Sequence, residues 1–333
     1  MSLAEVALGF AWLGLTAYAV FGGADFGGGF WYLFARRRQA GAAQRRLIED
    51  VIGPIWEANH VWLIFVLVVT WTAFPPVFAA VASTLYIPLT GAAFGIILRG
   101  SGFAFRTAVR GTLWDELFGR TFALSSVITP FFLGTVAGAI ASGRVPTGNA
   151  RGAAVASWLN GTSLVGGTLA VGICAYLAAV FLTADARRRD QLDLAESFRR
   201  RALATGVIVG AVAITGIGVL VVDAPPLARG LAGPGLPLVI ASAAGGIGSL
   251  GLLLRRRYVA ARVAAVAAVV SVLWAWAAAQ YPFLLVGELT IRDAQTAPTT
   301  LAALVGGLII GGIVIIPSLT WLYVLTQRVP ERR

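Results

Sequence analysis

One polar stretch within an apolar run directs the interpretation of this sequence: Gly53-Pro54-Ile55-Trp56-Glu57-Ala58-Asn59-His60-Val61-Trp62-Leu63-Ile64. The run continues without a charge as Phe65-Val66-Leu67-Val68-Val69, so the whole segment is typical of a membrane span. A charged side chain in hydrocarbon costs about 2.5–3.5 kcal/mol. A carboxylate, an amide and the only histidine, kept together at that cost, form a candidate functional site.

The composition is that of a polytopic membrane protein. Of the 333 residues, 58% are hydrophobic and 12% are charged, whereas a soluble domain has about twice that charged fraction. The mean hydropathy is +0.82. Backbone polar groups in a bilayer must be satisfied within their own segment, so apolar runs of about twenty residues predict helices. We therefore expect an all-α, polytopic membrane protein of about nine transmembrane helices, with residues 1–333 forming a single membrane domain.

Polar or turn-rich segments separate the predicted spans. The first span has no basic residue before it, so we expect it to be retained rather than cleaved. The longest intervening segment, 184–201, is charged, and no segment is suited to a soluble domain. The predicted spans are 6–34, 52–74, 77–98, 122–142, 154–183, 202–222, 236–254, 263–281 and 301–326.

The distribution of arginine predicts the orientation in the membrane. All 26 basic residues are arginine, and all but four lie in the segments 36–46, 99–120, 187–201, 255–262 and 328–333. The alternate loops hold Arg144, Arg151, Arg229 and Arg292. Because cytoplasmic loops carry the excess of basic residues, we expect the N-terminus outside and the C-terminus in the cytoplasm. Topology thus explains the net charge of +11, and we expect no nucleic-acid partner.

Only two of the fifteen acidic residues, Asp25 and Glu57, fall within predicted spans. Asp25 follows the outer start of its span by about 30 Å, and Glu57 lies about 10 Å in from the cytoplasmic side. We expect both carboxylates at a similar shallow depth on neighbouring helices. Burial of a carboxylate suits a proton relay. The alternative is a structural pair anchored by Arg99, at the inner end of the third span.

His60 follows Glu57 by three positions, so the two side chains share a helix face and are able to titrate as a unit. We expect the imidazole to be satisfied by Glu57 or by a backbone carbonyl. No metal site is predicted, because the chain has one histidine, one cysteine and one methionine. Cys174, in the middle of a span, is interpreted as a packing residue.

Two other features of these spans have more than one interpretation. Glycines surround Asp25 in Gly22-Gly23-Ala24-Asp25-Phe26-Gly27-Gly28-Gly29. They expose backbone to polar partners, or they allow helices to approach closely. Trp56 and Trp62 are candidate interfacial anchors, although the depth of Trp62 favours a helix–helix contact.

Taken together, three motifs resemble subunit II of the cytochrome bd-type quinol oxidases. The family's Gly-Phe-Asp-x-Gly-x-Gly is matched by Gly23-Ala24-Asp25-Phe26-Gly27-Gly28-Gly29. Its Pro-x-Trp-Asp-Gly-Asn-x-x-Trp-Leu is matched by Pro54-Ile55-Trp56-Glu57-Ala58-Asn59-His60-Val61-Trp62-Leu63. Its Arg-x-x-Gly-Phe-x-x-Arg is matched by Arg99-Gly100-Ser101-Gly102-Phe103-Ala104-Phe105-Arg106. The size and the number of spans agree as well.

This resemblance implies a heterodimer. Its subunit I carries haems b and d, or b only, oxidises ubiquinol or menaquinol and reduces dioxygen to water. Subunit II is haem-free, stabilises subunit I and helps deliver cytoplasmic protons. The resemblance further implies a bacterial or archaeal inner membrane, contact with lipid, and in some complexes a small single-helix accessory subunit. Carried over by residue, the proton pathway comprises Asp25, Glu57 and His60, and the supporting residues are Trp56, Asn59, Trp62, Arg99 and Arg106.

The sequence departs from the family pattern at three positions. Glu57 stands where the motif has Asp, His60 stands where Gln or Glu is common, and Ala104 replaces an acid that many members have. These departures indicate a divergent branch, of the cyanide-insensitive type. A proton-coupled secondary transporter that uses Asp25 and Glu57 is the alternative from another functional class. A purely structural scaffold for subunit I is a third possibility.

Overall fold

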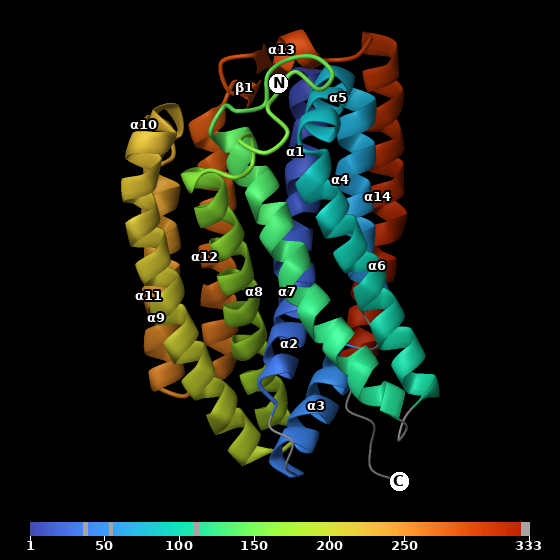
Figure 1. Cartoon of the computed structure of the whole chain (residues 1–333), viewed down its shortest axis with the longest axis vertical. Helices are drawn as coiled ribbons and strands as arrows, with labels where there is room; N and C mark the ends of the chain where they lie inside the picture. The colour runs from blue at the N-terminus through green and yellow to red at the C-terminus, as the bar shows by residue number, and fades with distance from the viewer. Residues whose placement is uncertain (36–38, 53–55, 110–112, 328–333) are drawn as a thin grey trace.

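The computed structural model describes residues 1–35, 39–52, 56–109 and 113–327, which form a bundle of long helices (Figure 1). Eight helical stretches of these residues are long and apolar enough to cross a membrane, and Glu57–Ala73 is a shorter apolar helix. The prediction of an all-α polytopic membrane protein is confirmed. The eight stretches are Leu3–Leu33, Tyr86–Phe105, Trp114–Ala141, Gly161–Arg188, Leu192–Asp223, Leu236–Leu254, Tyr258–Gln280 and Pro298–Leu322.

The elements follow one another in the order labelled in Figure 1. A π-helical segment, η1 (Tyr18–Gly22), separates the first two helices, and a two-stranded antiparallel sheet precedes the last two. The helices are α1 (Leu3–Ala17), α2 (Gly23–Leu33), α3 (Gln39–Ile52), α4 (Trp56–Ala73), α5 (Pro75–Thr84), α6 (Tyr86–Ala108), α7 (Leu113–Ala141), α8 (Gly161–Arg188), α9 (Leu192–Asp223), α10 (Pro225–Ala232), α11 (Leu236–Leu254), α12 (Tyr258–Gln280), α13 (Ile291–Ala294) and α14 (Pro298–Gln327); the strands are β1 (Phe283–Leu285) and β2 (Leu289–Thr290).

The predicted third span, 77–98, is wrong in its bounds. The chain forms the short helix α5, bends at Leu85 and starts again as α6, which extends beyond the predicted end. Pro88 explains the break, because proline has no N–H to donate and its ring clashes with the carbonyl four residues earlier, here that of Thr84. The span is therefore displaced towards the C-terminus and includes Arg99 well within its length.

Several segments predicted as loops are helical. The charged segment 184–201 contains the end of α8 and the start of α9, with a short turn between them. The segment before the second span contains α3, a separate amphipathic helix. In contrast, α8 begins later than predicted, at Gly161, because Asn160 caps it by accepting a hydrogen bond from the backbone N–H of Ser163 at 3.0 Å.

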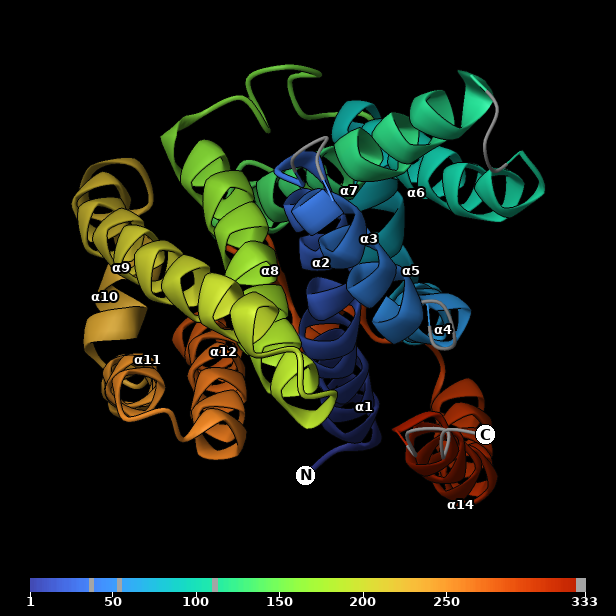
Figure 2. The same ribbon diagram turned by 90° about the horizontal axis from the view of Figure 1, so that it is seen from below.

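The bundle has two distinct ends. We call the end with the N-terminus, α10 and the β-strands the outer end, and the end with α3 the inner end (Figure 1). Helix α2 packs against α7 and α8, while α1 packs against α4. Seen from below, α14 stands at the edge of the bundle (Figure 2), and its main contacts are with α1 and α4.

Two apolar clusters hold the helices together. The larger surrounds α8 and includes Trp31, Phe122, Leu177 and Phe198. The second joins the first helix to the outer loops and includes Phe74 and Leu285. A polar group of side chains from α2, α4, α6 and α7 lies among these packed helices, and it contains Asp25, Asn59 and Arg99 from the sequence motifs.

Candidate functional site

Asp25 lies in the first turn of α2, directly after η1. At this point the backbone hydrogen bonding changes, because the N–H of Gly23 donates to the carbonyl of Tyr18, five residues earlier. Single π turns inside α-helices occur frequently at functional sites. Asp25 is only 3% exposed. The structure therefore places this acid within the protein rather than against lipid.

Two glycines on α2 allow the neighbouring helices to approach Asp25. A Cβ atom at Gly27 would overlap the carbonyl oxygen of Cys174 on α8, and one at Gly29 would overlap the side chain of Ser126 on α7. Small residues permit such close contacts between membrane helices. These contacts favour the close-packing interpretation of the glycines. Cys174 is buried in an apolar cluster with Tyr18 and Phe26.

Asn59 joins the second span to Asp25. Its amide Nδ2 donates a 2.7 Å hydrogen bond to Asp25 Oδ2, and it lies 3.5 Å from the carbonyl oxygen of Phe21 in η1. Asn59 is 1% exposed. A short hydrogen bond to a buried carboxylate is stronger than one between neutral groups, so Asn59 is a principal partner of Asp25.

Arg99 brings a positive charge to the same place. It is 1% exposed, and its Nη2 atom lies 4.0 Å from Asp25 Oδ2. The guanidinium lies between the rings of Phe26 and Phe122, with its Cζ 4.8 and 5.2 Å from the two centroids. Its Nε donates to the hydroxyl of Ser126 at 3.2 Å. A buried charge is tolerated when it is paired and hydrogen-bonded. Arg99 is paired with Asp25 and hydrogen-bonded through Nε, whereas its buried Nη2 atom has no hydrogen-bond partner among the described residues.

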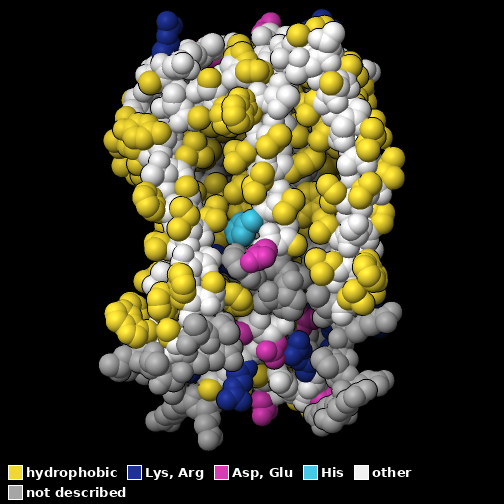
Figure 3. All heavy atoms as spheres, turned by 90° about the vertical axis from the view of Figure 1, so that its right-hand side faces the viewer, with side chains coloured by type: hydrophobic (Ala, Val, Ile, Leu, Met, Phe, Trp, Pro, Cys, Tyr) yellow, Lys and Arg dark blue, Asp and Glu magenta, His cyan; other side chains and the backbone are white. Residues whose placement is uncertain are grey.

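His60 contacts Arg99 at the edge of this cluster. Its Nε2 atom lies 3.5 Å from Arg99 Nη1, and its ring centroid lies 5.8 Å from that of Phe26 and 6.1 Å from that of Tyr18. His60 is half-buried. The space-filling view shows the imidazole at the molecular surface, with an acidic side chain beside it (Figure 3).

Glu57 differs from the expectation of a buried acid, because its side chain is exposed. It precedes Asn59 by two residues, which is about 200° around the helix axis. When Asn59 faces Asp25, Glu57 therefore faces away from it. Within the described part of the chain, Glu57 has no hydrogen bond or ion pair, so the prediction that it satisfies His60 is not supported.

The other supporting residues are described only in part. Trp62 is half-buried, its ring centroid lies 6.3 Å from that of Phe65, and it packs on the cluster of Tyr18, Phe26 and Cys174. This contact agrees with the expected helix–helix role. The side chains of Trp56 and Arg106 lie outside the described residues.

Ser126, Phe26 and Phe122 were not identified from the sequence, although all three contact Arg99. A serine within an apolar span is a weak signal, because its hydroxyl commonly bonds to its own helix. The aromatic residues resemble ordinary membrane-facing side chains. Nothing in the sequence alone distinguishes their contact with an arginine from contact with lipid.

The described residues contain no group of three or more His, Cys, Asp or Glu residues that could hold a metal ion. The single histidine directs its Nε2 atom at the buried guanidinium of Arg99, which is an unsuitable neighbour for a cationic iron. The cluster is suited instead to carrying and stabilising charge.

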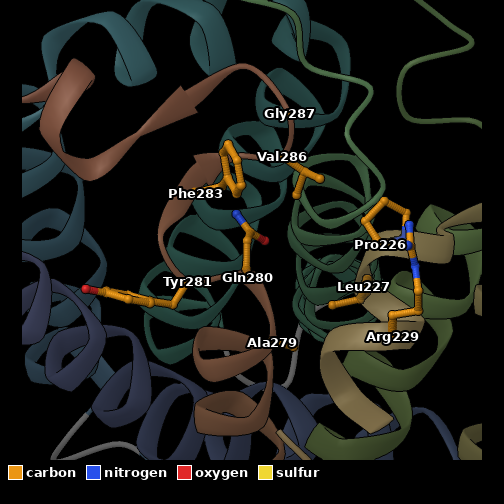
Figure 4. Close-up of a pocket in the computed structure, with 9 residues that line it drawn as sticks. All are labelled: Pro226, Leu227, Arg229, Ala279, Gln280, Tyr281, Phe283, Val286 and Gly287. Atoms are coloured by element: carbon orange, nitrogen blue, oxygen red, sulfur yellow. The ribbon is translucent and has the colours of Figure 1, made fainter. Parts of the chain in front are cut away.

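A cavity of about 350 Å³ lies elsewhere, at the outer end. Apolar side chains of α10 and of the β1 region line it, together with Arg229 and the end of α12 (Figure 4). Gln280, which also lines it, is occupied by hydrogen bonds to Trp276 and to the carbonyl of Leu284. Among its lining residues there is no carboxylate, and it is separate from the cluster around Asp25.

A family model matches nearly the whole of this chain, whereas the curated relatives match about half of it. The model of the family described as cytochrome bd terminal oxidase subunit II matches residues 3–326. The cytochrome bd ubiquinol oxidase subunit 2 of Bacillus subtilis is 30% identical over 162 residues, which are 48% of this chain and 47% of that protein. The cytochrome bd-I ubiquinol oxidase subunit 2 of Escherichia coli is 28% identical over 179 residues, which are 50% and 45% of the two chains.

The chain thus spans about half the length of the curated relatives it matches. The structural agreement is more extensive. A chain in the structure of bd oxidase from Geobacillus thermodenitrificans is 26% identical, with a TM-score of 0.77 over 98% of this chain and 99% of that one. The family match covers the buried cluster and all the spans, and the protein therefore belongs to the cytochrome bd terminal oxidase subunit II family.

Proposed function

We propose that this chain is the haem-free subunit of a membrane quinol:dioxygen oxidoreductase in an aerobic respiratory chain. It stabilises a haem-bearing subunit I and helps to deliver cytoplasmic protons for the reduction of dioxygen to water. The observation that carries this proposal is the burial of Asp25 within a membrane bundle, hydrogen-bonded to Asn59 and close to the buried charge of Arg99.

The members of the cluster have different roles in this proposal. Asp25 and His60 take up and release protons, whereas a guanidinium keeps its protons at physiological pH and cannot relay them. Arg99 therefore stabilises the negative charge of Asp25. Water molecules bridge the steps that the side chains do not join directly, since polar groups in such sites commonly bond to ordered water.

Glu57 is the outward member of the proposed route. An exposed carboxylate within a span costs about 2.5–3.5 kcal/mol against lipid, so protein or water must cover it. We propose that this face of α4 meets subunit I, and that Glu57 and His60 receive protons from the cytoplasmic side. The helical spacing of three residues keeps these two side chains on one face.

The remaining assignments follow from the family. The partner carries haems b and d, or b only, and ubiquinol or menaquinol is the electron donor of the complex. The complex lies in the inner membrane of a bacterium or archaeon, with lipid around it and in some cases a small single-helix subunit. The alternative of a proton-coupled transporter that uses Asp25 and Glu57 receives no support from the family match or from the structural match.

The Asp25→Asn variant, measured in the complex with its partner, tests the proposal. The change keeps the size of the side chain but replaces the titratable carboxyl group by an amide that cannot relay protons. We therefore expect turnover and proton uptake per haem to fall by about 10²–10⁴-fold, as for a positioned acid–base group. Asp25→Glu should recover part of the loss. Asp293→Asn is the control, because Asp293 bonds only within its own outer turn. Full turnover of Asp25→Asn would refute proton delivery through this acid.

A further inference from the structure

Ser126 contacts the buried cation but not the acid. Its hydroxyl oxygen accepts a hydrogen bond from Arg99 Nε at 3.2 Å, and the residue is 1% exposed. It lies on α7, whereas Arg99 lies on α6 and Asp25 on α2. The hydrogen bond between Ser126 and Arg99 therefore joins α7 to α6, close to Asp25 on α2.

The orientation of the Ser126 hydroxyl is fixed. It donates to the carbonyl oxygen of Phe122, one turn earlier, at 2.6 Å. Because a hydroxyl has one proton, the oxygen meets Arg99 with a lone pair and can only accept. The ring of Phe122 lies beside the same guanidinium, with its centroid 5.2 Å from Arg99 Cζ. One turn of α7 thus supplies both a hydrogen-bond acceptor and an aromatic face to Arg99.

Gly29 provides the space for this arrangement. A Cβ atom at this position would overlap both the Cβ and the Oγ of Ser126. Gly29 follows Asp25 by four residues, so both lie on the same face of α2. The backbone of α2 at Gly29 consequently packs against Ser126, one helical turn after Asp25.

We propose that Ser126 is a positioning residue for the proton-delivery site. A guanidinium is planar, so a hydrogen bond to Nε together with the nearby rings of Phe26 and Phe122 restricts the directions of the two remaining nitrogens. Those nitrogens are the ones that lie 4.0 Å from Asp25 and 3.5 Å from His60. This inference rests on the proposed function and adds a residue to it. The titratable groups that act on Arg99 are Asp25 from α2, His60 from α4, Tyr18 from η1 and Cys174 from α8.

A neighbouring serine makes a matched control possible. Ser125 is 2% exposed on the same helix, and its hydroxyl donates only to backbone carbonyls of α7, those of Thr121 and Phe122. The experiment compares Ser126→Ala with Ser125→Ala in the complex. We expect Ser126→Ala to lower kcat about tenfold, to leave KM for quinol unchanged and to alter the pH profile of kcat. Ser125→Ala should leave all three unchanged.

A second measurement separates positioning from folding. The carboxyl band of Asp25 in infrared difference spectra is identified by its loss in Asp25→Asn. This band should shift in Ser126→Ala and stay in place in Ser125→Ala, even where the yield of complex is low. In the Asp25→Asn background, Ser126→Ala should cause a smaller fractional loss of kcat than in the unmodified complex, because only the effect through the contact of Arg99 with His60 remains.

The outcomes distinguish this inference from the proposed function. If Asp25→Asn is impaired, but Ser126→Ala matches Ser125→Ala in kcat, pH profile and infrared band, Ser126 has no positioning role. If Asp25→Asn has full turnover, the proposed function fails first. A loss of kcat from Ser126→Ala that is as large in the Asp25→Asn background as in the unmodified complex would show that Ser126 does not act on Asp25.

Discussion

The amide of Asn59 donates a 2.7 Å hydrogen bond to the carboxylate of Asp25, and this bond joins the first two membrane spans of the chain. Both residues belong to the motifs that the sequence places on consecutive helices. Glu57, the acid of the second motif, lies on the far side of α4 and is exposed. The two spans therefore meet through an acid and an amide, and the second acid takes no part in this contact.

Replacing Asn59 should lower the thermal stability of the complex. Asn59→Leu keeps a similar volume but removes the donor, which leaves a lone pair of the buried Asp25 unmet at a cost of about 1–3 kcal/mol. We expect a lower melting temperature of the purified complex. Thr70→Val is the control on the same helix, because Thr70 bonds only to the carbonyl of Val66. Equal melting temperatures for the two variants would show that the bond to Asp25 contributes no stability.

The close approach of α2 and α8 predicts a strong effect at Gly27. In Gly27→Ala the added methyl group meets the backbone carbonyl of Cys174, which cannot rotate away, so the helices must separate. Overpacking of this kind costs about 1–3 kcal/mol. Gly9→Ala is the matched control in the same stretch, because its added Cβ would meet nothing within 4 Å. Thermal unfolding of both complexes tests the difference, and a stable Gly27→Ala complex would contradict the packing described.

The sequence was sufficient for the class of fold, because the length of an apolar run depends on the bilayer rather than on tertiary detail. It also identified Asp25, Asn59 and Arg99, since polar residues in such runs are exceptional. It did not indicate that the side chain of Glu57 faces away from Asp25, because the sequence does not show which face of α4 contacts α2. The break at Leu85 is predictable from Pro88, because a proline disrupts the helical turn that precedes it.

The contacts of Arg99 could not be predicted from the sequence. Ser126 and Phe122 lie more than twenty residues further along the chain, and their side chains meet the guanidinium only because α6 and α7 pack together. Likewise, the residues of η1 show no pattern that would distinguish this π-helical segment from a continuous α-helix. The contacts of Arg99 are thus a consequence of tertiary packing rather than of local propensity.

Glu57→Gln should separate function from stability. The side chain is exposed and the contact of His60 is with Arg99, so neither Glu57→Gln nor Glu57→Ala should lower the haem content of the complex. Both should reduce turnover, by about 10²-fold if Glu57 donates protons to the route. Glu116→Gln is a control, because Glu116 forms an exposed pair with Arg120, which contributes little to stability. Unchanged proton uptake in Glu57→Gln would assign the relay to Asp25 and His60 alone.

The outer loops should loosen at low pH. The backbone N–H and the hydroxyl of Thr147 both donate to Glu288, at 3.1 and 2.8 Å, and they hold the pKa of this exposed carboxyl below its usual value. A lowered pKa means that the contact stabilises the fold above the ordinary glutamate pKa, about 4.3, and is lost as the pH falls through the lower folded value. Hydrogen exchange at the Thr147 amide, corrected for its intrinsic rate, should rise at low pH. In Glu288→Gln the corrected rate should no longer depend on pH in this range.

The buried pair of Arg99 and Asp25 allows stability and function to be tested separately. Arg99→Gln leaves the Asp25 carboxylate buried without a cation, and breaking a buried pair from one side costs about 3–5 kcal/mol. We expect little assembled complex from this variant. Asp25→Asn should cost less, because the guanidinium keeps its contacts with Ser126, Phe26 and Phe122. The double variant Asp25→Asn/Arg99→Gln buries no charge at either position, so it should regain haem content and melting temperature but not turnover. Recovery of turnover in the double variant would mean that the pair is structural and that protons take another route.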